Sequence, residues 1–227
     1  MANEGDGAVE FCKQVLQQCT GFQKVTFFAV FDLVTKDSSL DQMRTLEMSE
    51  PRLHVVWAPE NRCAVDAYLR GYREALNANC NWILEIDAGF SHRPQDIPQF
   101  FSAMEEGRDC VFGSRFLGSF QRSSVVRHFI SWGGTKLSNL LLGTRQTDMT
   151  SGFQLFSREA LSAIMKEGIQ SRAHFFQTEI KAHCRNLRII EVPIIYSAAS
   201  RRLGKAALID AYWQLWRLFK LRLEGRL

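Results

Sequence analysis

The stretch ILEIDAGFSHRPQDIP, residues 83–98, decides the fold of this chain. It begins as a short hydrophobic strand that ends at Asp87, passes through Ala88 and Gly89, and turns into a helix marked by Pro94. In an open α/β sheet, ligands bind at the carboxyl ends of the strands, so Asp87 is placed to meet one. A carboxylate there can hold Mg²⁺ or Mn²⁺ and thereby a pyrophosphate, or it can simply cap the turn that follows.

Strand-like runs alternate with helix-length segments on both sides of this stretch. The expected strands are residues 25–31, 53–58, 82–87, 109–114 and 187–196. The expected helices are residues 8–19, 62–77 and 95–106. This alternation predicts an α/β fold built from βαβ units, with a mostly parallel sheet. No repeat or Pro/Gly/Ser-rich linker interrupts the pattern, which favours one main domain.

Two segments that mix basic and apolar residues depart from this pattern. Residues 119–145 surround the pair Gly133 and Gly134 and suit an amphipathic surface segment. Residues 207–223 predict a helix with aromatic side chains on one side and cations opposite, which is typical of a membrane interface. A helix that packs on the sheet has a similar pattern, and both alternatives stay open. We therefore divide the chain into a main domain, 1–206, and a C-terminal amphipathic helix, 207–227.

Composition excludes several classes of protein. The 227 residues are 46% hydrophobic and 23% charged, which is ordinary for a globular domain and excludes a disordered or collagen-like chain. No apolar run approaches the roughly 20 residues that span a bilayer, and the N-terminus lacks the profile of a secretory signal, so we expect a cytosolic protein. The six cysteines form no C-x-x-C pair, so no zinc or thioredoxin-type site is expected.

Positive charge is concentrated at the C-terminal end. The formal net charge is +4, and residues 201–227 hold seven basic and two acidic residues. The loop 200–205 has three cations around Gly204 and suits a diphosphate, although a solvated run of charges looks the same. Arg115 follows another strand-like run and could clamp a phosphate, or could be an exposed surface arginine. The basic tail lacks any motif that reads nucleic acid, so no nucleic-acid partner is expected.

Taken in order, these segments resemble one family. The runs are ILEIDAGFSHRPQDIP, VFGSRF, RHFISWGGTKLSNLLLGTRQTDMTSGFQLFSREAL and RIIEVPIIY followed by RRLGK. They resemble the inverting family 2 glycosyltransferases, and among these the dolichol- or polyprenol-phosphate mannose synthases, over roughly residues 3–205. The resemblance implies a GT-A nucleotide-diphospho-sugar transferase fold, in which a mostly parallel, Rossmann-like sheet lies between helices.

The resemblance also implies an activity. It implies transfer of a hexose, most often mannose, from GDP-mannose, or less often UDP-glucose, to a polyprenyl or dolichyl phosphate. Such an acceptor is already ionised near neutral pH and can attack the anomeric carbon without a catalytic base. The protein is then expected at the cytoplasmic face of a membrane, held there by its amphipathic helix or by a separate membrane protein.

Individual residues take roles from the resemblance. Asp32 corresponds to the aspartate that contacts the nucleoside, and Asp87 to the first aspartate of the D-x-D metal motif and thus to a ligand of Mg²⁺ or Mn²⁺. Glu4 is what remains of a P-x-Y-N-E type motif and is expected to bind the donor. The positions expected to touch donor or acceptor phosphates are Arg115, Arg127 and Ser131, with Arg202 and Lys205 as a basic flap over the donor diphosphate.

Two departures from the family pattern matter. Gly89 stands where the second metal-binding carboxylate is expected, so the metal ion would depend on Asp87, the pyrophosphate and water. The first strand of the family is also expected to be absent, since only Asn3, Glu4 and Gly5 correspond to its end. Loss of that strand would remove part of the nucleoside pocket.

Other functions stay open on the sequence alone. Transfer to a sugar or protein hydroxyl would need a carboxylate base, and Glu179, on the helix before the last strand, is the best placed. A truncated, inactive glycosyltransferase-like domain that only binds a partner is the alternative from a different class.

Overall fold

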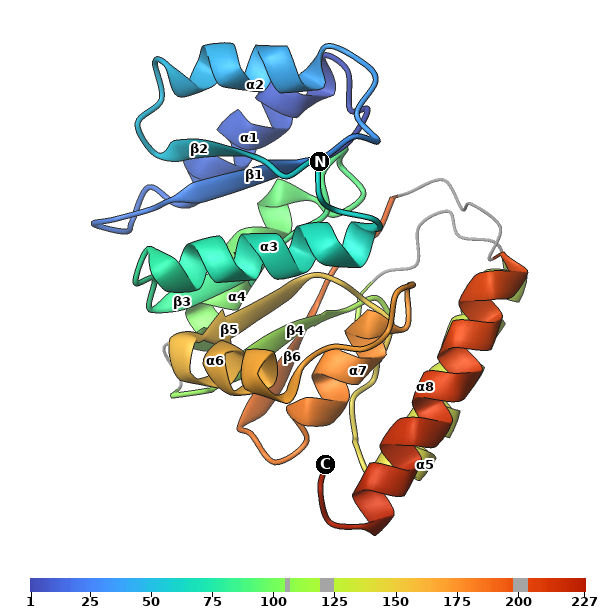
Figure 1. Ribbon diagram of the computed structural model, residues 1–227. Helices are drawn as coiled ribbons and strands as arrows, with labels where there is room; N and C mark the ends of the chain where they lie inside the picture. The colour runs from blue at the N-terminus through green and yellow to red at the C-terminus, as the bar shows by residue number, and fades with distance from the viewer. Residues whose placement is uncertain (105–106, 119–124, 198–203) are drawn as a thin grey trace.

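The computed structural model describes residues 1–104, 107–118, 125–197 and 204–227, with backbone alone at 125–128. Fifteen elements follow one another along this part of the chain (Figure 1). They are α1 (Gly7–Gln18), β1 (Phe27–Phe31), α2 (Ser39–Glu47), β2 (Leu53–Trp57), α3 (Ala64–Asn77), β3 (Trp82–Glu85), the 3₁₀ turn η1 (Pro94–Asp96), α4 (Ile97–Met104), β4 (Cys110–Ser114), α5 (Val125–Leu142), β5 (Gln154–Ser157), α6 (Arg158–Glu167), α7 (Phe176–His183), β6 (Ile189–Pro193) and α8 (Lys205–Leu223).

The strands of the described residues form two sheets. β1 and β2 pair in parallel, with Phe27 opposite Leu53. The second sheet has the order β3-β5-β4-β6, in which β4 and β6 are parallel while β5 is antiparallel to both of its neighbours. The five expected strands are confirmed, and β5 is a sixth that the sequence did not predict. β3, β4 and β6 all have the same direction, and only β5 has the opposite one. The predicted α/β fold with a mostly parallel sheet is therefore also confirmed.

Side chains of the second sheet alternate between two apolar cores. On β4, Phe112 packs with α3, α6 and α7, whereas Val111 packs with α1 and α4 on the opposite face. On β5, Phe156 and Leu155 divide in the same way. This is the period of two that a strand buried on both faces requires. The sheet thus lies between two layers of helices. Of these helices, α3 also contacts β1 (Figure 1).

The expected helices are confirmed with shifted ends. α1 and α3 fall within one or two residues of 8–19 and 62–77, and the helix expected at 95–106 is η1 followed by α4, with 105–106 outside the described residues. Within the amphipathic segment 119–145, α5 begins at Val125, and residues 119–124 lie outside the described part. The C-terminal helix starts at Lys205, two residues earlier than predicted.

Among the described residues, β1 and β3 each pair with a neighbouring strand on one side only. β1 pairs only with β2, and β3 pairs only with β5. The six described residues ahead of α1 contain no strand, but the Met1 nitrogen donates a hydrogen bond of 2.7 Å to the Val30 carbonyl. Met1 and Phe27 also pack into the cores on both sides of this edge. Met1 therefore contacts the end of β1, and residues 3–5 bind the segment that follows this strand.

Gly113 offers a test of this packing. A Cβ added there would lie 2.8 Å from Ile194 Cγ2 and 3.0 Å from Phe100 Cζ, so Gly113→Ala overpacks the core between β4 and α4. We expect a loss of about 1–3 kcal/mol in the free energy of unfolding, measured in urea. The matched control is Gly134→Ala on α5, where nothing lies within 4 Å and alanine should be neutral or stabilising by up to about 1 kcal/mol. Equal effects of the two substitutions would contradict the packing described.

Candidate active site

Three of the predicted site residues follow strands. Asp32 comes directly after β1, Asp87 lies two residues after the end of β3, and Arg115 comes directly after β4. Asp32 is buried, and its Oδ1 accepts a hydrogen bond of 2.9 Å from the amide of Val34. The sequence predicted that each of these three residues follows a strand, and the structure agrees. Ligands of an α/β sheet bind at such strand ends.

Two aromatic side chains, one half-buried and one buried, fix the position of Asp87. The hydroxyl of Tyr68, on α3, donates to Asp87 Oδ1. The amide of Asp87 donates to His92 Nδ1 at 3.2 Å, and its Oδ2 lies 3.7 Å from the same nitrogen. The Asp87 side chain remains 29% exposed. Its carboxylate is therefore held on one side and open to a ligand on the other.

His92 is a neutral positioning group rather than the cation of an ion pair. It is 1% exposed, and burial lowers its pKa although the Asp87 charge opposes that shift. Because Nδ1 accepts the Asp87 amide, the proton of the neutral ring is on Nε2. The ring stacks on Phe153 with centroids 5.0 Å apart and contacts Tyr196 at 5.2 Å. The histidine of the D-A-x-x-x-H run thus packs beneath the aspartate.

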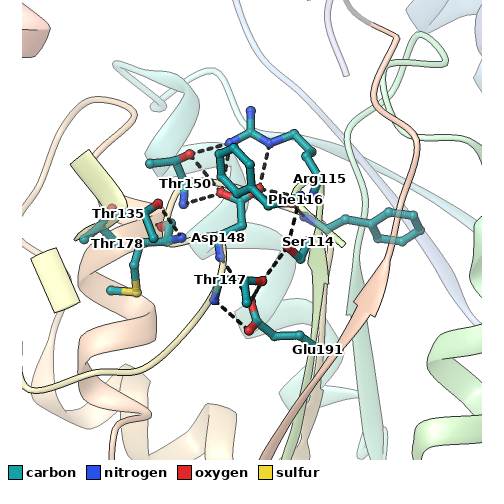
Figure 2. A network of polar contacts seen from close by, with 12 residues as sticks. Ser114, Arg115, Phe116, Thr135, Thr147, Asp148, Thr150, Thr178 and Glu191 are labelled. Atoms are coloured by element: carbon teal, nitrogen blue, oxygen red, sulfur yellow. Dashed lines mark hydrogen bonds and ion pairs between the residues drawn. The ribbon is translucent and has the colours of Figure 1, made fainter. Parts of the chain in front are cut away.

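Arg115 also contacts Tyr196 and is anchored by a buried carboxylate. Its guanidinium carbon is 5.6 Å from the Tyr196 ring centroid. Nε and Nη2 donate to the two oxygens of Asp148 at 2.7 and 2.9 Å, and Nη2 also reaches the hydroxyl of Thr150 at 2.5 Å (Figure 2). Among the described residues, Nη1 makes no hydrogen bond, and Figure 2 shows it directed away from Asp148.

The Asp148 carboxylate is fully buried and completely paired. Burial alone would raise its pKa, but the Arg115 charge and hydrogen bonds hold the pKa of Asp148 well below its usual range. In return, Asp148 raises the pKa of Arg115 although burial opposes this. The amide of Asp148 donates to Glu191, and its carbonyl accepts from Lys181 Nζ at 2.5 Å. Burial lowers the pKa of Lys181 to about 8.

Three carboxylates gather at the carboxyl ends of β1 and β3. Glu4, Asp32 and Asp87 all act on the Met1 amino group, whose pKa burial lowers. Glu4 lies against Gly89, since a Cβ added to that glycine would overlap Glu4 Oε2 and come within 3.2 Å of Cδ. The described residues contain no group of three or more histidine, cysteine or acidic side chains that could hold a metal ion. Two hard oxygen donors, from Glu4 and Asp87, nevertheless suit Mg²⁺ or Mn²⁺ when a diphosphate and water supply the rest.

The other predicted residues belong to α5, α7, α8 and a segment outside the described residues. Lys205 is exposed at the start of α8, Ser131 is half-buried on α5, and Arg127 is on α5 with its side chain outside the description. Arg202 lies outside the described residues. Glu179, on α7, is fully buried and accepts from the amides of residues 170 and 171 and from Arg217.

The contacts of Glu179 identify it as a packing group between α7 and α8. Its carboxylate is already occupied by three sets of donors and has no exposed surface. The sequence missed the residues that organise the strand ends, namely Tyr68, His92, Asp148, Lys181 and Tyr196. A signal existed only for His92, which is five residues after Asp87, and for Asp148, which precedes the turn at Thr150.

An apolar surface covers α5 and α8, which pack side by side (Figure 1). Of the large hydrophobic side chains on α8, only Leu218 is buried. Eleven others on the two helices are at least 44% exposed: Phe129, Ile130, Trp132, Leu137, Leu140, Leu208, Ile209, Tyr212, Trp213, Trp216 and Leu223. Lys136 and Lys220 lie over Trp132 and Trp216, 5.7 and 5.9 Å from the ring centroids. We call these residues the α5–α8 face.

The structure confirms in part that the C-terminal helix packs on the domain, whereas its contact with a membrane stays a prediction. α8 is docked on the domain by Leu218 and by Arg222 Nη1, which donates to the carbonyls of Leu140 and Leu141 at 2.8 Å. Its aromatic side chains remain outside, as at a membrane interface. Within the described residues, no helix has the length and hydropathy to cross a bilayer.

Comparison with known proteins identifies the family. The model of glycosyl transferase family 2 matches residues 1–165. The chain is 30% identical over 183 residues to an undecaprenyl-phosphate mannosyltransferase of Micrococcus luteus, covering 79% of this chain and 74% of the relative. It is 26% identical over 204 residues to a polyprenol monophosphomannose synthase of Mycolicibacterium smegmatis, covering 86% and 77%.

Solved structures support the same fold. A glucosyl-3-phosphoglycerate synthase of Mycobacterium tuberculosis superposes with a TM-score of 0.67 at 15% identity, over 97% of this chain and 78% of that one. Another structure of that enzyme, with a TM-score of 0.65 at 15% identity over 98% and 75%, contains Mn²⁺, uridine diphosphate and phosphoglyceric acid. The expected GT-A fold is thereby confirmed.

The pair Arg115 and Asp148 provides a prediction about stability. Asp148→Asn leaves the guanidinium without its counter-charge in a buried site, and we expect a loss of about 3–5 kcal/mol in the free energy of unfolding in urea. The matched control is Asp109→Asn, which breaks an equally bidentate pair with Arg188 whose guanidinium is exposed. That change should be small or unmeasurable. Comparable losses in both variants would show that Asp148 is not the anchor described.

Proposed function

The chain belongs to glycosyl transferase family 2, and on that premise we propose that it moves mannose from GDP-mannose to a polyprenyl phosphate at a membrane surface. Both curated relatives carry names that state a mannose and a polyprenyl acceptor. UDP-glucose is the alternative donor, because the solved structures of the same fold include complexes with it. The reaction class is that of a glycosyltransferase in either case.

The single observation that supports a lipid as the acceptor is the α5–α8 face. Eleven large apolar side chains lie outside the core on two neighbouring helices, and four of them are Trp or Tyr. Contiguous exposed apolar surface of this kind is unfavourable in water and marks an interaction site. The lysines over Trp132 and Trp216 add cations that suit anionic lipid headgroups. An enzyme that acts on a soluble acceptor needs no such face.

The chemistry then requires a single displacement. An oxygen of the acceptor phosphate forms a bond to the anomeric carbon, and the bond from that carbon to the donor diphosphate breaks, with its electron pair leaving on the nucleoside diphosphate. A single displacement inverts the configuration at the anomeric carbon. No proton has to be removed, because the attacking phosphate is already ionised.

This chemistry agrees with the burial of Glu179. A hydroxyl acceptor needs a carboxylate base within reach of it. Glu179 is enclosed by its donors and by Arg217, so the candidate base for a hydroxyl acceptor is engaged elsewhere. The proposal therefore gives Glu179 a structural role and favours the phosphate acceptor.

Arg115 is the group that we assign to the developing charge. Asp148 fixes the guanidinium by two hydrogen bonds and leaves Nη1 directed outwards from the end of β4. A donor fixed before the reaction stabilises charge without reorganisation. We assign Asp32 and Glu4 to the donor side, and Arg127, Ser131, Arg202 and Lys205 to phosphate contacts.

A divalent cation completes the donor site in this proposal. Asp87 would bind Mg²⁺ or Mn²⁺ through the carboxylate oxygen that Tyr68 leaves available. When bound, the ion neutralises part of the charge on the diphosphate leaving group. We also propose that the protein is peripheral, on the cytoplasmic face of a membrane, where nucleotide sugars and the acceptor phosphate can meet.

The acceptor class can be tested directly. Purified protein with radiolabelled GDP-mannose and Mg²⁺ should glycosylate a polyprenyl phosphate in vesicles but not the corresponding polyprenol, since the alcohol needs a base. The measurement is labelled lipid extracted into organic solvent. Parallel reactions with UDP-glucose identify the donor. Transfer to neither lipid, with transfer to a soluble hydroxyl acceptor instead, would contradict the proposal.

Arg115→Lys extends this experiment to the mechanism. Lysine keeps the charge that Asp148 needs but loses the fixed fork of donors, so we expect turnover to fall about 100-fold. The matched control is Arg188→Lys, the same substitution in the exposed pair with Asp109, which should leave turnover unchanged. If Arg115→Lys retains full turnover in the same assay, this residue does not stabilise the reacting phosphates.

The membrane contact has its own test. Trp213→Ser and Leu140→Ser remove exposed side chains from α8 and α5, and each should weaken binding to anionic vesicles about tenfold, because burying a large apolar side chain contributes roughly 1.5–3 kcal/mol. Vesicle co-sedimentation measures the change. The control is Trp57→Ser, which removes an exposed tryptophan from β2. Equal loss in the control, or none in either variant, would exclude the α5–α8 face as the membrane contact.

A further inference from the structure

Gly89 and Glu4 share one space at the carboxyl ends of the strands. Gly89 has φ +73°, and a Cβ built on it would overlap Glu4 Oε2. A side chain at residue 89 would therefore displace the Glu4 carboxylate from the space that it occupies. Gly89 is the position where the family pattern expects the second metal-binding carboxylate, so the group that fills this place is itself a carboxylate, supplied by a distant part of the chain.

The backbone around Glu4 is fixed by the loop after β1. The Glu4 amide donates to Ser39 Oγ at 3.0 Å, and the Gly5 amide donates to Asp37 Oδ2 at 2.7 Å. Asn3 exchanges hydrogen bonds with Lys36 and Val34 on the same loop. These contacts hold the main chain of residues 3–5 at a place from which the Glu4 side chain reaches Gly89.

The carboxylate of Glu4 is left without a hydrogen-bond partner among the described residues, although its main chain is well tied down. Asp87 likewise has an oxygen, Oδ2, that makes no hydrogen bond among the described residues and lies 3.7 Å from Nδ1 of His92. Asp32 adds a third negative charge, which acts on the same Met1 amino group as Glu4 and Asp87. A bound cation would offset the negative charge of these carboxylates.

We propose that Glu4 replaces the missing second carboxylate and binds, together with Asp87, the divalent cation of the donor site. This inference rests on the proposed function and deepens it. The two side chains supply two hard oxygen ligands, and the donor diphosphate and water complete the coordination, which is the usual arrangement for Mg²⁺. Gly89 is then required not for its flexibility alone but because it makes room for Glu4.

The test measures metal binding rather than turnover. The full chain is titrated with Mn²⁺ in the presence of GDP or UDP, and the free ion is followed by its electron paramagnetic resonance signal. Glu4→Gln keeps the shape of the side chain and removes its charge, so we expect Mn²⁺ to bind at least about tenfold more weakly. Glu10→Gln, an exposed glutamate on α1 whose partner is Gln14, is the matched control and should not change binding.

A second measurement separates a metal ligand from a nucleoside contact. In the presence of chelator, Glu4→Gln should bind the nucleoside diphosphate as well as the unmodified chain or better, since a repulsive charge is gone. Equal weakening with and without metal would assign Glu4 to the nucleoside and overturn the proposal. Unchanged Mn²⁺ affinity in Glu4→Gln would overturn it as well.

The carboxylate can also be moved between the two positions. Gly89→Asp alone should lower the thermal stability, because the new side chain meets Glu4. Glu4→Ala combined with Gly89→Asp removes that overlap, and aspartate tolerates positive φ, so the double variant should recover most of the Mn²⁺ affinity that Glu4→Ala alone loses. No recovery in a folded double variant counts against the shared position. If the unmodified chain binds neither GDP nor UDP, with or without Mn²⁺, the proposed function fails first.

Discussion

The buried pair of Asp148 and Arg115 is the interaction on which the strand-end cluster depends. Asp148 has no exposed surface, and a carboxylate in that position is tolerated only when its charge is compensated and its oxygens are hydrogen-bonded. Arg115 provides the compensation and is oriented in return (Figure 2). Lys181 and Glu191 bind the main chain of Asp148 from α7 and β6. One buried charge thereby joins β4, β6 and α7 and directs Nη1 of Arg115 outwards.

The sequence predicted most of the fold because most elements have a periodic apolar pattern of sufficient length. β5 was missed for a physical reason. It has only four residues, and its first, Gln154, is polar yet fully buried, bound to the side chain of Gln177. Glu85 on β3 is the neighbouring case, since burial raises its pKa to about 8 and Tyr72 and Gln177 donate to it. Polar groups buried in this way are satisfied by distant partners that a local pattern does not contain.

The same limit applies to the candidate site. Asp32, Asp87 and Arg115 could be placed because each follows its own strand, which is a local property. The partner of Arg115 lies 33 residues further along the chain, and the hydroxyl that holds Asp87 lies 19 residues before it. Which acidic group lies beside Gly89 depends on how residues 3–5 bind the segment that follows β1. These pairings follow from the packed structure and have no signature at fixed spacing.

The attachment of α8 explains how one helix can be both docked and available to a membrane. Its fixed points are mostly polar and directional, from Arg217 to Glu179, from Ser171 to Asp210 and from Arg222 to the end of α5. Such bonds set the orientation of a helix without using its apolar side chains. A helix docked by hydrophobic burial alone would have hidden the aromatic residues that α8 leaves exposed. Because the helix begins at Lys205, directly after the basic loop, the same element joins the apolar face to the cations that follow β6. In the function that we propose, an interface that binds the apolar face therefore also constrains where Lys205 meets phosphate.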